Sequence, residues 1–207
     1  MLADGDRTAS RSDSVKVMSL APQLERIDME LADARRRAHE IATPLVPEHW
    51  SARPAADQWS VAECLTHLNL TSRAFLPLIR DAIARGRDLK LLGAGPYRRD
   101  VVGWSLYWLI EPAVRFRFKT TVPFVPAGVE PKDRILGVFD TLQEQLVACV
   151  READGLDLGR LRIISPFDSR IKYNLYSCLR IIPAHQRQHL SQAEKVIHTL
   201  CSVGAGE

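Results

Sequence analysis

Four long stretches of this chain repeat apolar residues at the spacing of an α-helix. They cover residues 21–43, 60–85, 132–153 and 168–201. In the first stretch, the apolar stripe runs through Leu24, Ile27 and Leu31, with charged residues on the opposite face. Such a stripe has to be buried against neighbouring helices, and little of the chain alternates as strands do. We therefore expect an all-α fold, an antiparallel four-helix bundle.

The ends of these helices carry recognisable signals. Ser60 and Glu63 form the S-x-x-E pattern of a capping box, which places the start of the second helix. Pro44 ends the first helix. Gly86 and Gly155 are placed to end the second and third helices.

The regions outside the four helices are of two kinds. Residues 1–17 are polar and without pattern, so we expect a disordered tail, and Met18 is a candidate for the true start of translation. The patterned domain then covers residues 18–203. Within it, residues 88–131 form an unusually long insert between the second and third helices, with a short helix expected at 105–116. We expect this insert to cap one end of the bundle.

Composition excludes several classes of protein. The chain has 207 residues, 46% of them hydrophobic, and a formal net charge of +3, which is typical of a globular domain and too mild for nucleic-acid binding. Its longest apolar run is too short to span a membrane, so we expect no membrane partner. The four cysteines are scattered and form no CxxC pair, which favours a reduced, cytoplasmic protein.

Three of the six histidines are predicted to face the core. His67 shares its helical face with Cys64 and Leu68, and His185 and His189 lie one turn apart in an apolar stripe of the last helix. The remaining three, by their faces or by their place in a linker, are expected at the surface: His39, His49 and His198.

Three imidazoles directed into one bundle core have two interpretations. Neutral imidazole is a good ligand for zinc, nickel, copper or iron, and three protein ligands leave a position open for water or substrate. Alternatively, they are core histidines with hydrogen-bond partners of their own. The residues alone leave both interpretations open.

Two segments together resemble a known family. The stretch "WSVAECLTHL", from Trp59 to Leu68, and the stretch "HQRQHLSQ", from His185 to Gln192, are similar to the DinB/YfiT-like superfamily of bacterial four-helix bundles. "EPAVRFRFKTTVPFVP" and "LDLGRLRIISPFDSRIKYNL" resemble its DinB-like branch. The resemblance implies that His67, His185 and His189 bind a metal ion. It also implies a thiol-dependent activity, since relatives transfer or use low-molecular-weight thiols.

Other residues are weaker candidates for the site. Gln192, one turn after His189, is placed either to contact a metal-bound water or substrate or to fill the core. Glu63, one turn before His67, is either a hydrogen-bond partner of that ring or only part of the capping box. Arg115 and Arg117 are candidates for binding an anionic substrate. Trp104 belongs with Tyr107 and Trp108 to a cluster expected in the core of the cap or at a substrate entrance.

The first functional hypothesis is a metal-dependent enzyme, either a thiol-dependent S-transferase or a hydrolase. A divalent ion, zinc or nickel, would lower the pKa of a bound water or thiol. The alternatives are a non-catalytic metal- or ligand-binding stress-response bundle and a bundle whose histidines are only structural. We expect a small-molecule substrate. The exposed cap is a candidate interface for a homodimer.

Overall fold

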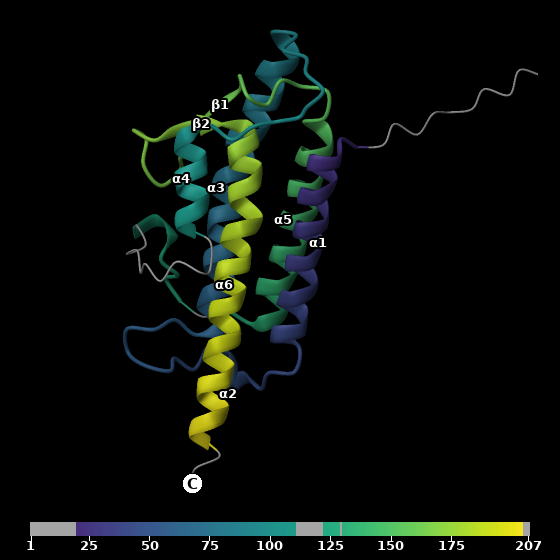
Figure 1. The fold of residues 1–207 in the computed structure, drawn as a ribbon. Coiled ribbons are helices and arrows are strands. Elements are labelled where there is room, and N and C mark those ends of the chain that lie inside the picture. The colour runs from purple at the N-terminus through teal and green to yellow at the C-terminus, as the bar shows by residue number, and fades with distance from the viewer. Residues whose placement is uncertain (1–19, 111–121, 129, 205–207) are drawn as a thin grey trace, which may run out of the picture.

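The computed structural model describes residues 20–110, 122–128 and 130–204 of the chain. Four long helices form the body of the molecule (Figure 1). They are α1 (Pro22–Ala42), α3 (Val61–Asp88), α5 (Lys132–Glu152) and α6 (Leu175–Gly204). The smaller elements are α2 (Pro47–Ser51), α4 (Val101–Ile110), η1 (Val122–Phe124), β1 (Arg162–Ile164) and β2 (Lys172–Asn174). The expected four-helix bundle is confirmed.

Helices α3 and α5 run parallel, not antiparallel. Arg80 donates a hydrogen bond to Gln145 (3.0 Å), and two turns further along both helices Arg87 forms an ion pair with Glu152 (3.3 Å). Both pairs are separated by 65 residues, and a constant separation means that the two helices advance in the same direction. The expectation of a fully antiparallel bundle is therefore wrong for this pair.

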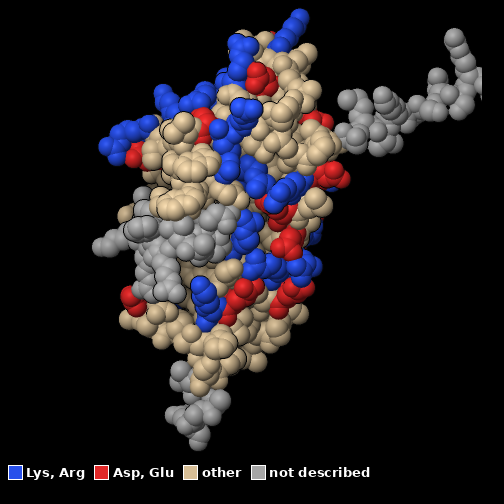
Figure 2. All heavy atoms as spheres, viewed as in Figure 1, with Lys and Arg blue, Asp and Glu red and all other residues tan. Residues whose placement is uncertain are grey.

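Helices α1 and α6 are the second parallel pair. Glu30 pairs with Arg180 near the start of both helices, and Arg37 pairs with Glu194 further along both. The face that these helices form mixes positive and negative side chains (Figure 2). The physical reason for the parallel pairs is the long connection after α3, which returns the chain to the end where α3 begins. There, Trp50 Nε1 donates to the carbonyl oxygen of Glu130 (3.2 Å).

The described part of the segment between α3 and α5 does not lie only at one end of the bundle. Its first part lies at the end of the bundle, where the Gly93 amide donates to the Gly155 carbonyl oxygen (3.0 Å). Helix α4 instead packs along α6, so closely that a Cβ on Gly103 would lie 2.1 Å from Ser177 Oγ. This helix starts four residues before the expected 105, and the expected end at 116 lies outside the described residues. The tail of residues 1–17 and Met18 also lie outside them.

Two further expectations about helix ends are wrong. Gly86 does not stop α3, which continues to Asp88; Gly86 is buried because Leu161 packs where a side chain would be, 2.8 Å from the position that a Cβ would take. The last helix begins at Leu175 and not at Asp168, since β1 and β2 form an antiparallel hairpin before it. Strands of three residues are too short to show an alternating pattern in the sequence.

The buried apolar residues form two clusters along the bundle. The first includes Leu31, Phe75, Ile79, Leu146 and Ile182, and the second includes Ala38, Leu65, Leu68, Phe139 and Leu190. Between Ile182 and Leu190, helix α6 presents polar side chains to the interior instead. The candidate site lies at this boundary. No helix in the described ranges is long and apolar enough to cross a membrane.

Candidate metal centre

The three histidines expected to face the core lie together. His67 belongs to the second turn of α3, whose start is fixed by the capping box between Ser60 and Glu63. His185 and His189 lie one turn apart on α6, between the two apolar clusters. His67 is buried, whereas His185 and His189 remain partly exposed. His67 is thus the most deeply buried of the three.

The spacing of the ring nitrogens fits a single metal ion. One nitrogen from each ring lies within 4.8 Å of the other two, and Nε2 of His67 lies 3.3 Å from Nε2 of His185. Two imidazole nitrogens bound at ~2.0–2.1 Å to one tetrahedral ion lie ~3.3–3.4 Å apart. The pair of His67 and His185 therefore has the spacing that one zinc ion requires, and imidazole also suits nickel.

Two of the three rings are oriented by hydrogen bonds from their other nitrogen. His67 Nδ1 lies 2.7 Å from the carbonyl oxygen of Phe124, and His189 Nδ1 lies 3.0 Å from Oε1 of Gln192. Carbonyl and amide oxygens only accept hydrogen bonds, so each Nδ1 carries the proton. In the neutral ring, Nε2 then holds a free lone pair directed into the cluster, which is the state a metal ligand needs.

The environment keeps all three rings neutral. Burial lowers the pKa of His67, and burial together with the neighbouring His189 and His67 lowers the pKa of His185 well below its usual value. Burial and the nearby His67 lower the pKa of His189 to about 3. A neutral imidazole keeps its lone pair, so these histidines are ready to bind a cation near pH 7.

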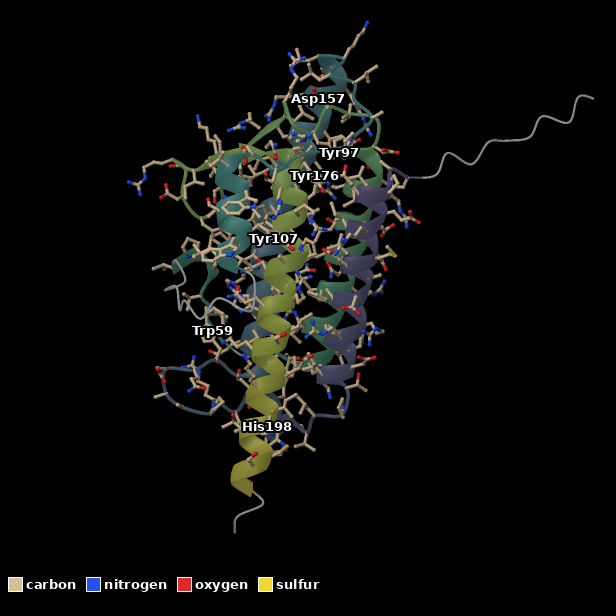
Figure 3. All side chains as sticks on the ribbon, viewed as in Figure 1. Trp59, Tyr97, Tyr107, Asp157, Tyr176 and His198 are labelled. Atoms are coloured by element: carbon tan, nitrogen blue, oxygen red, sulfur yellow. The ribbon has the colours of Figure 1, made fainter. Side chains whose placement is uncertain are left out.

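Aromatic rings flank the cluster. The Trp59 ring centroid lies 4.9 Å from that of His67 and 5.8 Å from that of His189, stacked on the latter. On the other side, Phe167 lies 6.2 Å from His185. Figure 3 shows Trp59 beside the middle of α6, whereas His198 lies nearer to the C-terminal end of that helix.

Of the two weaker candidates near the histidines, Gln192 contacts a histidine ring and Glu63 has other partners. Gln192 reaches the cluster, as a partner of the His189 ring. The Glu63 carboxylate accepts from the Ser60 amide (2.9 Å) and forms an ion pair with Arg53. His67 therefore has the Phe124 carbonyl as its partner in place of the one that the sequence suggested.

The more distant candidates are not brought to the histidines by any described contact. Trp104 and Trp108 lie on α4 with 56% and 55% of their surface exposed, so they are not core residues of a cap. Tyr107 instead lies under the guanidinium of Arg99, 4.2 Å from it. Arg115 and Arg117 lie outside the described residues.

The other histidines lie where the sequence places them. His49 and His198 are exposed. The half-exposed His39 pairs with Asp140 (3.0 Å) on the surface between α1 and α5.

Three contacts of the cluster could not be anticipated fully. The carbonyl of Phe124 is a backbone group, so no pattern of side chains in the sequence predicts its contact with His67. Phe167 comes from the turn between β1 and β2, a hairpin that the sequence pattern did not predict. Trp59 directly precedes the capping box, two turns before His67. This position was the only sign in the sequence that its ring could contact the cluster.

Comparison with known proteins decides the family. A family model of the DinB superfamily matches residues 30–193, which contain all three histidines. The chain belongs to the DinB superfamily. The membership in this superfamily was thus correctly expected from the two quoted segments.

A solved structure has the same overall fold as this DinB-superfamily chain. It is YfiT from Bacillus subtilis, described as a probable metal-dependent hydrolase with an unusual four-helix bundle topology. The two chains share 13% identity with a TM-score of 0.58, over 95% of this chain and 94% of YfiT. No curated protein sequence matches the chain.

Proposed function

We propose that this protein is a metal-dependent hydrolase that holds one divalent ion, zinc or nickel, through Nε2 of His67, His185 and His189. The observation that carries the proposal is the convergence of three imidazole nitrogens within 4.8 Å. The description of YfiT as a probable metal-dependent hydrolase supports it. A bound ion supplies Lewis acidity, which lowers the pKa of a coordinated water and polarises a substrate carbonyl.

The residues around the histidines have defined parts in this proposal. The Phe124 carbonyl and Gln192 hold the His67 and His189 rings in the tautomer that presents Nε2. Removing partners of this kind commonly weakens metal binding by roughly 10- to 100-fold. Because His185 and His189 are partly exposed, a small molecule would reach the site by way of these two residues.

Thiol-dependent transfer is the second candidate, and the structure limits its form. Cys64 is the cysteine nearest to His67 along α3, but it is buried, and burial together with Glu63 raises its pKa to about 12. It would remain a thiol near pH 7 and a poor nucleophile. A transfer reaction at this site would therefore use a small thiol supplied from outside the chain.

The first test is elemental analysis of protein purified without a histidine tag or a metal column. We expect close to one zinc or nickel ion per chain, and almost none in a His185→Ala/His189→Ala variant. The matched control is His198→Ala, which removes an exposed histidine of the same helix. A wild-type protein that stays metal-free after incubation with either ion and desalting would overturn the proposal.

The second test separates the two reactions. Metal-loaded protein is assayed for hydrolysis of small carboxylic esters, and for conjugation of a small thiol to an activated aryl halide. Hydrolysis without added thiol, lost in the double variant, supports the hydrolase. Product formation only when the thiol is present supports the transferase.

A further inference from the structure

The histidine cluster lies between two partly exposed aromatic side chains. Trp59 precedes α3 and contacts His67 and His189, whereas Phe167 comes from the turn between β1 and β2 and contacts His185. Phe167 also contacts Phe75, two turns after His67 on α3 (5.8 Å between centroids). Trp59 and Phe167 thus lie on opposite sides of the cluster along the bundle.

Their exposure distinguishes them from the core aromatics. Phe75, Phe124 and Phe139 are 2%, 6% and 0% exposed, as expected for side chains that only fill the interior. Trp59 and Phe167 are partly exposed, although both rest against the histidines. Neither residue is therefore fully enclosed, and they lie against the partly exposed His189 and His185, respectively.

The described residues that hydrogen-bond to the three histidines or make ring contacts with them are uncharged. The groups that act on the three histidines are each other, the Phe124 carbonyl and Gln192. Glu63, one turn before His67 on α3, is neutralised by its ion pair with Arg53. Among the described residues, the side chains in contact with the three histidine rings are thus two aromatic rings and one amide.

We infer that Trp59 and Phe167 bind an aromatic or otherwise apolar group of the substrate beside the metal position. This inference rests on the proposed metal site and specifies the class of molecule that it takes. Aromatic rings prefer offset-stacked or edge-on partners, and burying an apolar group against them adds the hydrophobic contribution of the covered area. A substrate with a methyl group in that place would lose these contacts.

The test uses cobalt-loaded protein and two metal-binding probes, acetohydroxamate and benzohydroxamate. Both carry the same binding group, and they differ only in a methyl or a phenyl substituent. Their dissociation constants are read from the visible absorption of the cobalt ion. We expect the wild-type protein to bind benzohydroxamate roughly tenfold more tightly than acetohydroxamate, the scale of a stacking and burial contribution.

Variants assign the preference to the two rings. Trp59→Ala and Phe167→Ala should each reduce the ratio of the two affinities by about threefold or more, because the loss falls mainly on benzohydroxamate. Trp108→Ala is the matched control, because it removes an exposed tryptophan of α4 that has no described ring contact with a histidine. The control should keep the wild-type ratio.

The outcomes separate this inference from the proposed function. A cobalt spectrum that responds equally to both probes, or a ratio unchanged in both variants, overturns the aromatic subsite and leaves the metal site standing. A wild-type protein that binds no cobalt overturns both. If Trp59→Ala fails to hold cobalt, Phe167→Ala decides the question, because Phe167 contacts only His185 among the three histidines.

Discussion

His185 and Gln186 are neighbours on α6, yet they belong to polar clusters of opposite character. Gln186 pairs with Gln143 of α5: each amide donates to the oxygen of the other, at 3.0 and 2.9 Å, and Gln143 also donates to the Leu31 carbonyl (3.2 Å). Both side chains are almost fully buried. The Nε2 atoms of His185 and His67, by contrast, have only each other among the described residues.

The two clusters differ in whether their polar groups are paired within the protein. A buried polar group is costly unless it is paired, so the glutamine pair is closed and can only hold α5, α6 and α1 in register. The three histidines instead each bring one ring nitrogen within 4.8 Å of the other two, an arrangement that can hold a metal ion. A cation held there satisfies all three lone pairs at once.

The largest expected effect concerns the response of the histidine cluster to metal. Zinc at about 1,000 times its dissociation constant should stabilise the folded chain by about 4 kcal/mol, or roughly 10 °C in Tm. His185→Ala/His189→Ala should melt at the same temperature with zinc and with EDTA. Thermal melts monitored by circular dichroism measure this, with His198→Ala as the control. If zinc raised the Tm of the double variant as much as that of the wild type, the metal would bind elsewhere.

The next effect tests the closed cluster. Gln143→Ala leaves the Gln186 amide unpaired and opens a cavity, and we expect the free energy of unfolding to fall by about 3 kcal/mol. Urea denaturation measures the change. Bound metal, determined on the same folded protein, should remain at the wild-type level. Loss of metal from this variant would show that metal binding at the histidines depends on the glutamine pair. The two clusters would then not be independent.

A smaller effect concerns pH and the metal-free protein. His189 has a pKa of about 3 when folded and near 6.5 when unfolded, so between these values the unfolded chain binds the additional proton. Its contribution therefore lowers the stability as pH falls below 6.5, by about 1.4 kcal/mol for each pH unit. His189→Gln should show a shallower loss between pH 7 and pH 5, a difference of about 2 kcal/mol at pH 5. Urea denaturation of both proteins at each pH measures this. If the free energy of unfolding fell equally with pH in both proteins, the neutral state of His189 would be contradicted.

The smallest effect concerns Glu63, which lies next to the histidine cluster without belonging to it. Glu63→Ala removes the capping box and the ion pair with Arg53, and we expect a loss of about 1 kcal/mol. The zinc affinity should be unchanged, because Phe124 and not Glu63 holds the His67 ring. Competition with a chromophoric chelator measures that affinity. A tenfold loss of zinc affinity in this variant would show that Glu63 does act as a partner of the His67 ring.

Local sequence patterns predicted much of this protein correctly. The stripe of Leu24, Ile27 and Leu31 is buried as expected, and the capping box starts α3 as its sequence indicates. The inward faces of His67, His185 and His189 were also predicted correctly. These properties follow from 3.6 residues per turn and from side chains a few positions apart, so they can be read from a single segment.

Contacts between distant segments could not be read in this way. The parallel directions of α3 and α5, the Phe124 carbonyl beside His67 and the approach of Leu161 to Gly86 all join residues far apart in the chain. The sequence by itself determined four amphipathic helices and three inward histidines, because each depends on local periodicity. Only the tertiary structure decided that the three imidazoles meet within 4.8 Å, because the packing of α3 against α6 sets that distance.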